Sequence, residues 1–438
     1  MPIGDLILQL LQAGWTGLLD YLAAHVLLCL LPAFFIAGYL GGLMPPEVVT
    51  RYLGPKTPKW ISYPASAIGG FLLAVCSCTI LPLFAGIWKR GAGLGPAITF
   101  LFVGPAVNIL AISYTGAAIG LDIALARIVL SIAFGIVIGL IMAAIFRGEQ
   151  TAVQNATMFE GQAALRPALW ALFGLLIAVL IAGTLQIDLL TGTLFSVTLP
   201  LELPAGVGST LDALNLTVQG AVLILMLVLI APLAWKGFNN VLSAVSSWTW
   251  GALVLVGLTV LLAAPTTEKG SLVIHITGRF VAELLLIGAI GYVATRKLTE
   301  DELAHWLWET WRFVKQIFPL LLAGVFLAGM ARAIIPEDWI RALAGQNTLP
   351  ANLLAVLFGV FMYFPTLVEV PIARMFLDLG MHRGPLLAYL LADPELSLQS
   401  ILVTGRILGR RKTAVYVSLV AVFSTLAGYL FGAALAAL

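Results

Sequence analysis

Cys76 and Cys78 stand two positions apart and are the residues of this sequence best suited to binding a ligand. Thiolates are soft ligands that bind soft metals and metalloids. In a continuous helix the two sulfurs would lie about 200° apart, so joint ligation requires a break in the helix near Cys76–Thr79. The alternative is that both are small, apolar packing residues, which is how we interpret the isolated Cys29. With three cysteines in all, the chain has no disulfide framework.

Two polar residues accompany the cysteines. Asn108 follows Gly104-Pro105, a pair that interrupts a helix, so its amide could face unwound backbone or a bound solute. A polar contact between helices is the alternative. Thr79 adjoins Cys78, and its hydroxyl could face the same cavity or simply satisfy a backbone carbonyl. We therefore predict a substrate site, with a metalloid held by the two thiols, that contains Cys76, Cys78, Thr79 and Asn108.

Three acids, Glu369, Asp393 and Glu395, lie within apolar stretches of the C-terminal part. A charged residue at mid-membrane depth costs about 2.5–3.5 kcal/mol on insertion scales, and such residues are functional by default. Burial favours the protonated, neutral form of a carboxyl group. We therefore predict that these acids bind and release a proton as substrate moves, with Glu369 the first candidate. The alternative is that an acid pairs with Arg374 or Arg127 and serves stability.

The composition indicates what surrounds these residues. Of 438 residues, 61% are hydrophobic and 10% are charged, whereas charged residues make up about a quarter of a soluble globular chain. A stretch of about 20 apolar residues can cross a bilayer. Such stretches recur near 19–43, 59–88, 93–118, 121–146, 167–187, 217–235, 242–264, 276–295, 316–335, 350–377, 384–405 and 413–437. The sequence thus predicts an all-α, polytopic bundle of transmembrane helices in contact with the lipid bilayer.

Other classes of function find little support. The formal net charge is +2 and the basic residues are scattered, so no basic stripe indicates nucleic-acid binding. The chain has neither a His-Glu-x-x-His motif nor a phosphate-binding Gly-x-x-x-x-Gly-Lys motif, and we predict neither an enzyme nor a cofactor. The N-terminus lacks the features of a cleaved signal peptide. We expect a multi-pass protein of the cell (cytoplasmic or inner) membrane.

The chain contains an internal repeat. A shift of 289 positions places Gly70, Pro82, Gly91, Gly95 and Pro105 on Gly359, Pro371, Gly380, Gly384 and Pro394. Gly and Pro break helices, and paired interruptions in two halves indicate a binding site near the membrane midplane. An old duplication whose kinks only serve packing is the alternative. We divide the chain into a first transmembrane repeat, linker helices and a second transmembrane repeat, at 1–146, 147–300 and 301–438.

Charge placement favours inverted repeats. If every apolar stretch spans the membrane once, Lys and Arg divide evenly between its two sides, against the positive-inside rule. If 59–88 and 350–377 are instead re-entrant hairpins or broken helices, most basic residues fall on the cytoplasmic side. The breaks would lie near Cys76–Thr79 and Pro365–Val368. The two structural repeats then have opposite orientations, an architecture suited to alternating access.

The motifs of the first half are similar to those of a known family, the ArsP/YraQ-type predicted permeases. The similarity extends over both repeats and rests on the order Cys76-Ser-Cys78-Thr79, Pro82, Lys89-Arg-Gly91, Gly95-Pro96 and Gly104-Pro105-Ala-Val-Asn108. Some members of that family export trivalent organoarsenicals, so the resemblance implies an efflux permease. A trivalent arsenic that carries one methyl group has two exchangeable positions, which two thiols could fill.

These inferences combine into one leading hypothesis. The chain is a proton-coupled permease that exports small soft metalloid species, with a midplane site lined by thiols and carboxylates. One alternative is a permease for another small solute, in which the cysteines are incidental. Another is a membrane partner protein that transports nothing. A homo-oligomer is compatible with all three.

Overall fold

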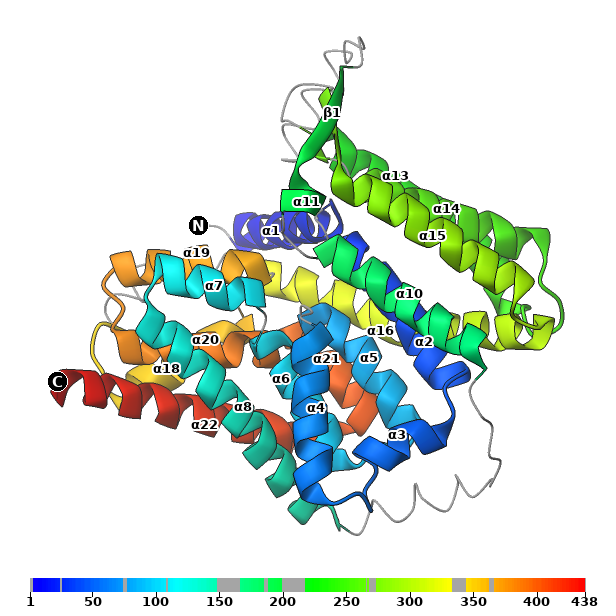
Figure 1. Cartoon of the computed structure of the whole chain (residues 1–438). Helices are drawn as coiled ribbons and strands as arrows, with labels where there is room; N and C mark the ends of the chain where they lie inside the picture. The colour runs from blue at the N-terminus through cyan, green and yellow to red at the C-terminus, as the bar shows by residue number, and fades with distance from the viewer. Residues whose placement is uncertain are drawn as a thin grey trace. The chain divides into compact units, whose positions relative to one another are not determined.

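The computed structural model of the chain describes residues 3–23, 26–73, 77–107, 109–147, 166–184, 188–198, 217–264, 266–267, 273–332, 344–361 and 366–437. These residues are α-helical apart from three short strands and the connections (Figure 1). They form two compact units, which we call the repeat unit and the linker unit. The repeat unit comprises Met1–Trp15, Pro46–Gly161 and Gln316–Leu438, and the linker unit comprises Thr16–Pro45 and Gln162–Lys315.

Two helices, α1 (Ile3–Ala23) and α16 (Glu300–Arg332), contribute to both units. The repeat unit contains α3 (Pro46–Leu53), α4 (Lys59–Leu73), α5 (Ser77–Lys89), α6 (Leu94–Ala106), α7 (Ile109–Ala118), α8 (Leu121–Ile145), α18 (Leu349–Phe361), α19 (Thr366–Asp378), α20 (Arg383–Leu396), α21 (Leu398–Leu408) and α22 (Arg410–Ala437). The linker unit contains α2 (Val26–Gly42), α10 (Pro167–Thr184), α11 (Asp188–Thr191), β1 (Thr193–Thr198), α13 (Val218–Asn239), α14 (Ser247–Ala263), β2 (Thr266–Thr267), β3 (Val273–Thr277) and α15 (Gly278–Arg296).

Several of these helices are suited to a membrane. Among the described residues, 5 helices are long and apolar enough to cross it, or up to 7 spans if each of two bent helix pairs counts as one. The five are α8, α13, α15, α16 and α22. Other apolar helices, such as α6 and α10, are shorter than these five. The predicted helical membrane bundle is thereby confirmed.

The helices of the repeat unit recur in the same order. The helices α5, α6, α7 and α8 begin at Ser77, Leu94, Ile109 and Leu121, and α19, α20, α21 and α22 begin at Thr366, Arg383, Leu398 and Arg410, each 289 positions later. The turns recur as well. Gly91 and Gly380 have φ of 86° and 95°, and Gly120 and Gly409 have φ of 147° and 87°. Only glycine adopts such angles without strain, so the repeat preserves the backbone turns.

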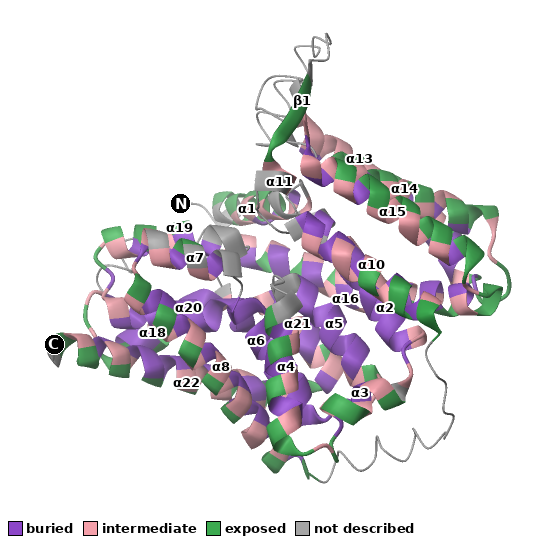
Figure 2. Ribbon diagram, viewed as in Figure 1, coloured by how far each residue is buried: buried purple, intermediate pink, exposed green. Residues whose placement is uncertain are grey.

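Glycines also bring the same helices together in each repeat. A Cβ atom on Gly95 of α6 would lie 2.9 Å from the carbonyl oxygen of Gly139 in α8, and one on Gly384 of α20 would lie 2.8 Å from that of Gly428 in α22. Small residues let helix backbones approach closely in a bilayer. Figure 2 shows that α6 and α20 are buried along nearly their whole length. These two helices therefore form the centre of the repeat unit.

The two repeats contact each other reciprocally. Helix α5 of the first repeat packs on α21 of the second, while α19 of the second packs on α7 of the first. Figure 1 shows α7 and α19 side by side. Reciprocal contacts of this kind are what a two-fold relation produces. The opposite orientation of the repeats across a membrane stays a prediction, as does the division at 146 and 300.

The two predicted breaks, Cys76–Thr79 and Pro365–Val368, lie only partly within the described residues. Ser77–Thr79 and Thr366–Val368 form the starts of α5 and α19, while α4 ends at Leu73 and α18 ends at Phe361. Residues 74–76 and 362–365 lie outside the described residues, so the hairpins stay a prediction. A further break separates α20 from α21, where the chain bends by 46°. Ser397 stands at this break, and its hydroxyl accepts a hydrogen bond from the backbone N–H of Ser400. The capping hydroxyl satisfies one free donor of the new helix.

The linker unit joins helices to a small sheet. Helix α10 packs on α2 and α15, and α13 packs on α14. The strands follow the order β1-β3-β2 and are all antiparallel. Ile274 of the central strand β3 lies opposite Val197 of β1 and opposite Thr267 of β2. We predicted only helices for 147–300, so the sheet is an addition. Its signal is the β-branched and aromatic run of 193–198, which favours a strand.

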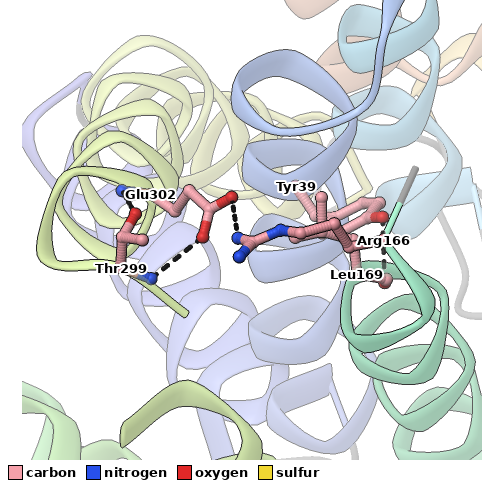
Figure 3. A network of polar contacts seen from close by, with 5 residues as sticks. All are labelled: Tyr39, Arg166, Leu169, Thr299 and Glu302. Carbon is pink, nitrogen blue, oxygen red and sulfur yellow. Dashed lines mark hydrogen bonds and ion pairs between the residues drawn. The ribbon is translucent and has the colours of Figure 1, made fainter. Parts of the chain in front are cut away.

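The start of α16 is fixed by a polar network (Figure 3). The Thr299 N–H donates to Glu302 Oε2 at 2.9 Å, and the Glu302 N–H donates to Thr299 Oγ1 at 3.3 Å. This reciprocal arrangement is a capping box. The Glu302 carboxylate also pairs with Arg166, just before α10. In the same view the Tyr39 hydroxyl donates to the Leu169 carbonyl at 2.9 Å, which ties α2 to α10.

Candidate functional site

A buried ion pair lies inside the repeat unit. Arg127 of α8 and Glu369 of α19 have side chains 0% and 1% exposed, and Arg127 Nη2 lies 3.0 Å from Glu369 Oε2. Arg127 Nε also donates a hydrogen bond of 3.2 Å to the carbonyl of Ala106, the last residue of α6. Carbonyls in the last turn of a helix lack partners within the helix. The arginine therefore joins a helix end of the first repeat to a carboxylate of the second.

Asp393 of α20 completes this cluster. It is 1% exposed and interacts electrostatically with both Glu369 and Arg127. Asp393 Oδ1, Glu369 Oε1 and Arg127 Nη1 have no hydrogen-bond partner among the described residues. Two ionised acids and one arginine would leave one surplus negative charge, and an unpaired buried charge is unfavourable. The binding of one proton would make the cluster neutral.

A second polar contact occupies the equivalent place in the other repeat. Tyr416 and Glu395 stand 289 positions after Arg127 and Ala106. The Tyr416 hydroxyl donates a hydrogen bond of 2.7 Å to Glu395 Oε2, and both residues are buried. The contact between α8 and the end of α6 is thus repeated between α22 and the end of α20. An arginine makes it in one repeat and a tyrosine in the other.

The two acids of α20 face different surroundings. Asp393 and Glu395 are two residues apart, and residues at that spacing point about 200° apart around a helix. Asp393 interacts with the charges of Arg127 and Glu369, whereas Glu395 contacts the neutral Tyr416. The three predicted acids therefore form a pair that shares one arginine, and a third carboxyl group with its own partner.

Glu395 borders a narrow crevice. Both repeats supply its walls. The other lining residues are Ile80, Leu81 and Leu101 of the first repeat and Pro394, Ser400 and Thr404 of the second. Ile80 and Leu81 directly follow the predicted thiol segment in α5. Glu395 Oε1 has no hydrogen-bond partner among the described residues. This oxygen is an acceptor that a proton could occupy.

The structure describes part of the predicted thiol site. Thr79 is buried in the first turn of α5. Cys78 belongs to the same turn, but its side chain is not among those described, and Cys76 and Asn108 lie outside the described residues. No group of three or more His, Cys, Asp or Glu within the described ranges could hold a metal ion. That thiols and acids share one cavity stays a prediction.

Arg127 is the residue that our choice of site residues left out. We named it with Arg374 only as an alternative partner for an acid, and the structure pairs it with Glu369. Arg374 instead pairs with Asp378 at 3.0 Å, where both side chains are about half exposed or more. The available signal was that Arg127 is the one basic residue of the 25-residue apolar helix α8. An ionisable residue at such a place is functional by default.

Comparisons with known proteins complete the description. The sequence matches the family ArsP_1, described as a predicted permease, over residues 13–433. It is 34% identical over 436 residues to a UPF0718 protein of Methanocaldococcus jannaschii, and the alignment covers 99% of this chain and 98% of that protein. No solved structure matches the chain. The family match spans both repeats and the linker helices, and the apolar helices agree with a multi-pass membrane protein. The chain therefore belongs to the ArsP_1 family of predicted permeases.

Proposed function

We propose that this permease couples the export of a small soft metalloid species, such as a trivalent organoarsenical, to the movement of protons across the cell membrane. The proton part is supported by one observation, the buried cluster of Arg127, Glu369 and Asp393 where the two repeats meet. A charge cluster at a repeat interface suits alternating access because substrate and coupling ions bind there in many transporters.

Within the cluster, Asp393 is the residue that exchanges the proton. Glu369 is held by Arg127 at 3.0 Å, whereas Asp393 Oδ1 has no hydrogen-bond partner among the described residues. Protonation of Asp393 neutralises the surplus charge and leaves Arg127 paired with Glu369. Loss of the proton makes Asp393 a second acid that competes for the same guanidinium group. The sequence alone favoured Glu369 for this role, and the ion pair is our reason for the change.

The metalloid part rests on Cys76 and Cys78. Methylarsenite exchanges its two hydroxyl groups for two thiol sulfurs. Each exchange forms one arsenic–sulfur bond, and the hydroxyl group that leaves takes up the thiol proton to become one water molecule. The exchange is neutral overall, so it requires little desolvation of charge. We include Thr79 and Asn108 in the proposed site, and the outward direction of transport follows from the family resemblance.

Transport by purified protein tests this proposal. Proteoliposomes that contain only this chain are expected to accumulate methylarsenite when a proton gradient is imposed. The double variant Cys76→Ser with Cys78→Ser is expected to lose that uptake, while Cys29→Ser retains it as the matched control. Uptake that survives the double variant would show that the cysteines do not bind substrate. Inorganic arsenite, measured in parallel, reports whether the methyl group matters.

A cellular assay separates transport from a partner role. Cells sensitive to methylarsenite are expected to gain resistance when they express the chain. Resistance in cells combined with no uptake by proteoliposomes would favour a membrane partner protein. Uptake of a different small solute, unaffected by the cysteine variants, would favour a permease with incidental thiols.

A further inference from the structure

The linker unit contains a groove whose walls are almost entirely apolar. Its volume is about 390 Å³, which lies within the range of small-molecule pockets. Five helices supply the walls: α2, α10, α14, α15 and the start of α16. Residues from each are Leu31, Leu176, Val254, Ile287 and Leu307. A polar solute would find few hydrogen-bond partners here, and its desolvation would be unfavourable. The groove therefore fits a hydrocarbon chain.

The indole N–H of Trp306 is already used. Trp306 lines the groove, and its Nε1 donates a hydrogen bond of 2.9 Å to the carbonyl of Phe35 in α2. The ring of Trp306 also packs edge-on against Phe35, with centroids 5.7 Å apart. The polar atom thus fixes the ring, and the remaining ring surface is available for contact with an apolar ligand.

One end of the linker helices lies at the level of lipid headgroups. Helix α16 has 33 residues, a length of about 50 Å, whereas the hydrocarbon core is about 30 Å thick. Its first half is rich in charge and tryptophan, so we place residues 300–315 at the interface, where Trp and Lys are favoured. Helix α13 ends and α14 begins at the short 240–246 connection, which Lys315 reaches through Asn239.

A lysine is held at this end on α13. Lys236 Nζ lies 4.7 Å from the centre of the Trp248 ring. Trp248 is in the first turn of α14, two residues before Trp250, which lines the groove. A cation above an indole is attracted by the negative face of the ring. The two tryptophans point about 200° apart around α14, so Lys236 lies at the same end of α14 as Trp250 but on another side of the helix.

A second lysine is held on α16. Lys315 Nζ lies 4.9 Å from the centre of the Trp308 ring and 2.9 Å from Asn239 Oδ1. Trp308 directly follows Leu307, another wall residue. Neither Lys315 nor Lys236 has an ion pair within the described part of the chain, in contrast to Arg166, which Glu302 neutralises (Figure 3). Both ammonium groups keep their charge available for an anion.

We propose that the groove holds an acyl chain of an anionic phospholipid from the bilayer, with the lipid phosphate against Lys236 and Lys315. An apolar groove, interfacial indoles and two lysines without an ion pair in the described part of the chain together match the two parts of such a lipid. Basic sites between membrane helices bind anionic headgroups, and each lysine near the surface strengthens binding by about five-fold.

Quenching of tryptophan fluorescence tests the acyl-chain part. The whole chain is reconstituted into phosphatidylcholine vesicles that contain a small fraction of phosphatidylglycerol with brominated acyl chains, because bromine quenches indoles on contact. Trp250 and Trp306 are expected to be quenched more strongly than the fraction of brominated lipid in the whole bilayer would produce. Gly291→Leu, which fills the groove, is expected to remove this excess. Nothing lies within 4 Å of a Cβ on Gly291 or on Gly288, so Gly288→Leu is a matched control outside the groove.

The headgroup part is tested by exchanging the lysines. The preference for phosphatidylglycerol is measured by comparing quenching by brominated phosphatidylglycerol with quenching by brominated phosphatidylcholine. The double variant Lys236→Gln with Lys315→Gln is expected to weaken this preference by about five-fold per lysine. Lys56→Gln, in the repeat unit, is the control and is expected to leave the preference unchanged. Equal quenching by both lipids in the parent chain overturns the proposal. So does quenching of Gly291→Leu equal to that of the parent. If the leucine variant fails to fold, Trp250→Phe leaves the groove open and must itself lower the excess quenching.

Discussion

Arg127 and Glu369 stand 242 positions apart in the sequence, yet their side chains lie 3.0 Å apart. The ion pair joins α8 of the first repeat to α19 of the second, and water reaches neither side chain. Loss of one partner from such a pair leaves an uncompensated charge, whereas loss of both leaves none. The cluster around Arg127 can therefore be tested by comparing single and double variants.

Arg127→Met is expected to lower the free energy of unfolding by about 3–5 kcal/mol, because Glu369 remains buried without its base. The double variant Arg127→Met with Glu369→Met is expected to recover most of that loss. Unfolding of the purified protein in detergent measures both. Arg374→Met is the control, since its contacts with Asp378 and with the Ala118 carbonyl are exposed, and an exposed ion pair contributes about 1 kcal/mol or less. A double variant no more stable than Arg127→Met would contradict the buried pair.

Asp393→Asn is expected to separate substrate movement from proton movement. The amide cannot bind the proton, and it leaves the cluster neutral in every state. Exchange of labelled for unlabelled substrate across proteoliposomes should continue, while accumulation driven by a proton gradient should be lost. Asp378→Asn, on the exposed side of α19, is the matched control. Gradient-driven accumulation by Asp393→Asn at the parent rate would remove this residue from the coupling.

Tyr416→Phe is expected to destabilise the protein by about 1.5–3 kcal/mol, because Glu395 loses its hydrogen bond of 2.7 Å inside the repeat unit. The melting temperature in detergent reports the change. Tyr429→Phe, on the same helix and partly exposed, should have a much smaller effect. Equal effects of the two substitutions would show that the Tyr416 hydroxyl does not stabilise the structure.

Gly409→Ala is expected to destabilise the chain by about 1–2 kcal/mol through the backbone alone. Gly409 has φ of 87°, and nothing lies within 4 Å of an added Cβ. Gly405 also has open space around it but lies inside α21, so Gly405→Ala should stabilise the protein by about 0.4–1 kcal/mol. Unfolding measurements on the two variants should therefore differ in sign. The same sign for both would contradict the repeated turn.

The repeat could be predicted from sequence because glycine and proline record backbone geometry directly. Gly91 and Gly380 mark equivalent turns, and the structure finds both with φ in the left-handed region. Matching helix starts follow from the same spacing. A local pattern of this kind needs no knowledge of which helices pack together.

The partners of the acids could not be predicted in the same way. Arg127, Glu369 and Asp393 meet only after α8, α19 and α20 have packed. The sequence marks Arg127 as unusual within an apolar helix, but it does not identify the acid that the arginine contacts. The sheet of the linker unit was missed for a related reason. Its strands β1 and β3 pair over a long sequence separation, with Thr198 opposite Val273. Short strands between apolar helices leave only a weak pattern.

The repeated contact with unlike side chains has an evolutionary consequence. Tyr416 stands where a copy of Arg127 would be, and Ile80 stands where a copy of Glu369 would be. Two joined copies of the first half would bury two arginines with no acid at position 369. Two joined copies of the second half would bury two glutamates with no arginine. Divergence has therefore made the halves non-interchangeable, and a split gene could restore this protein only as a heterodimer of one half of each kind.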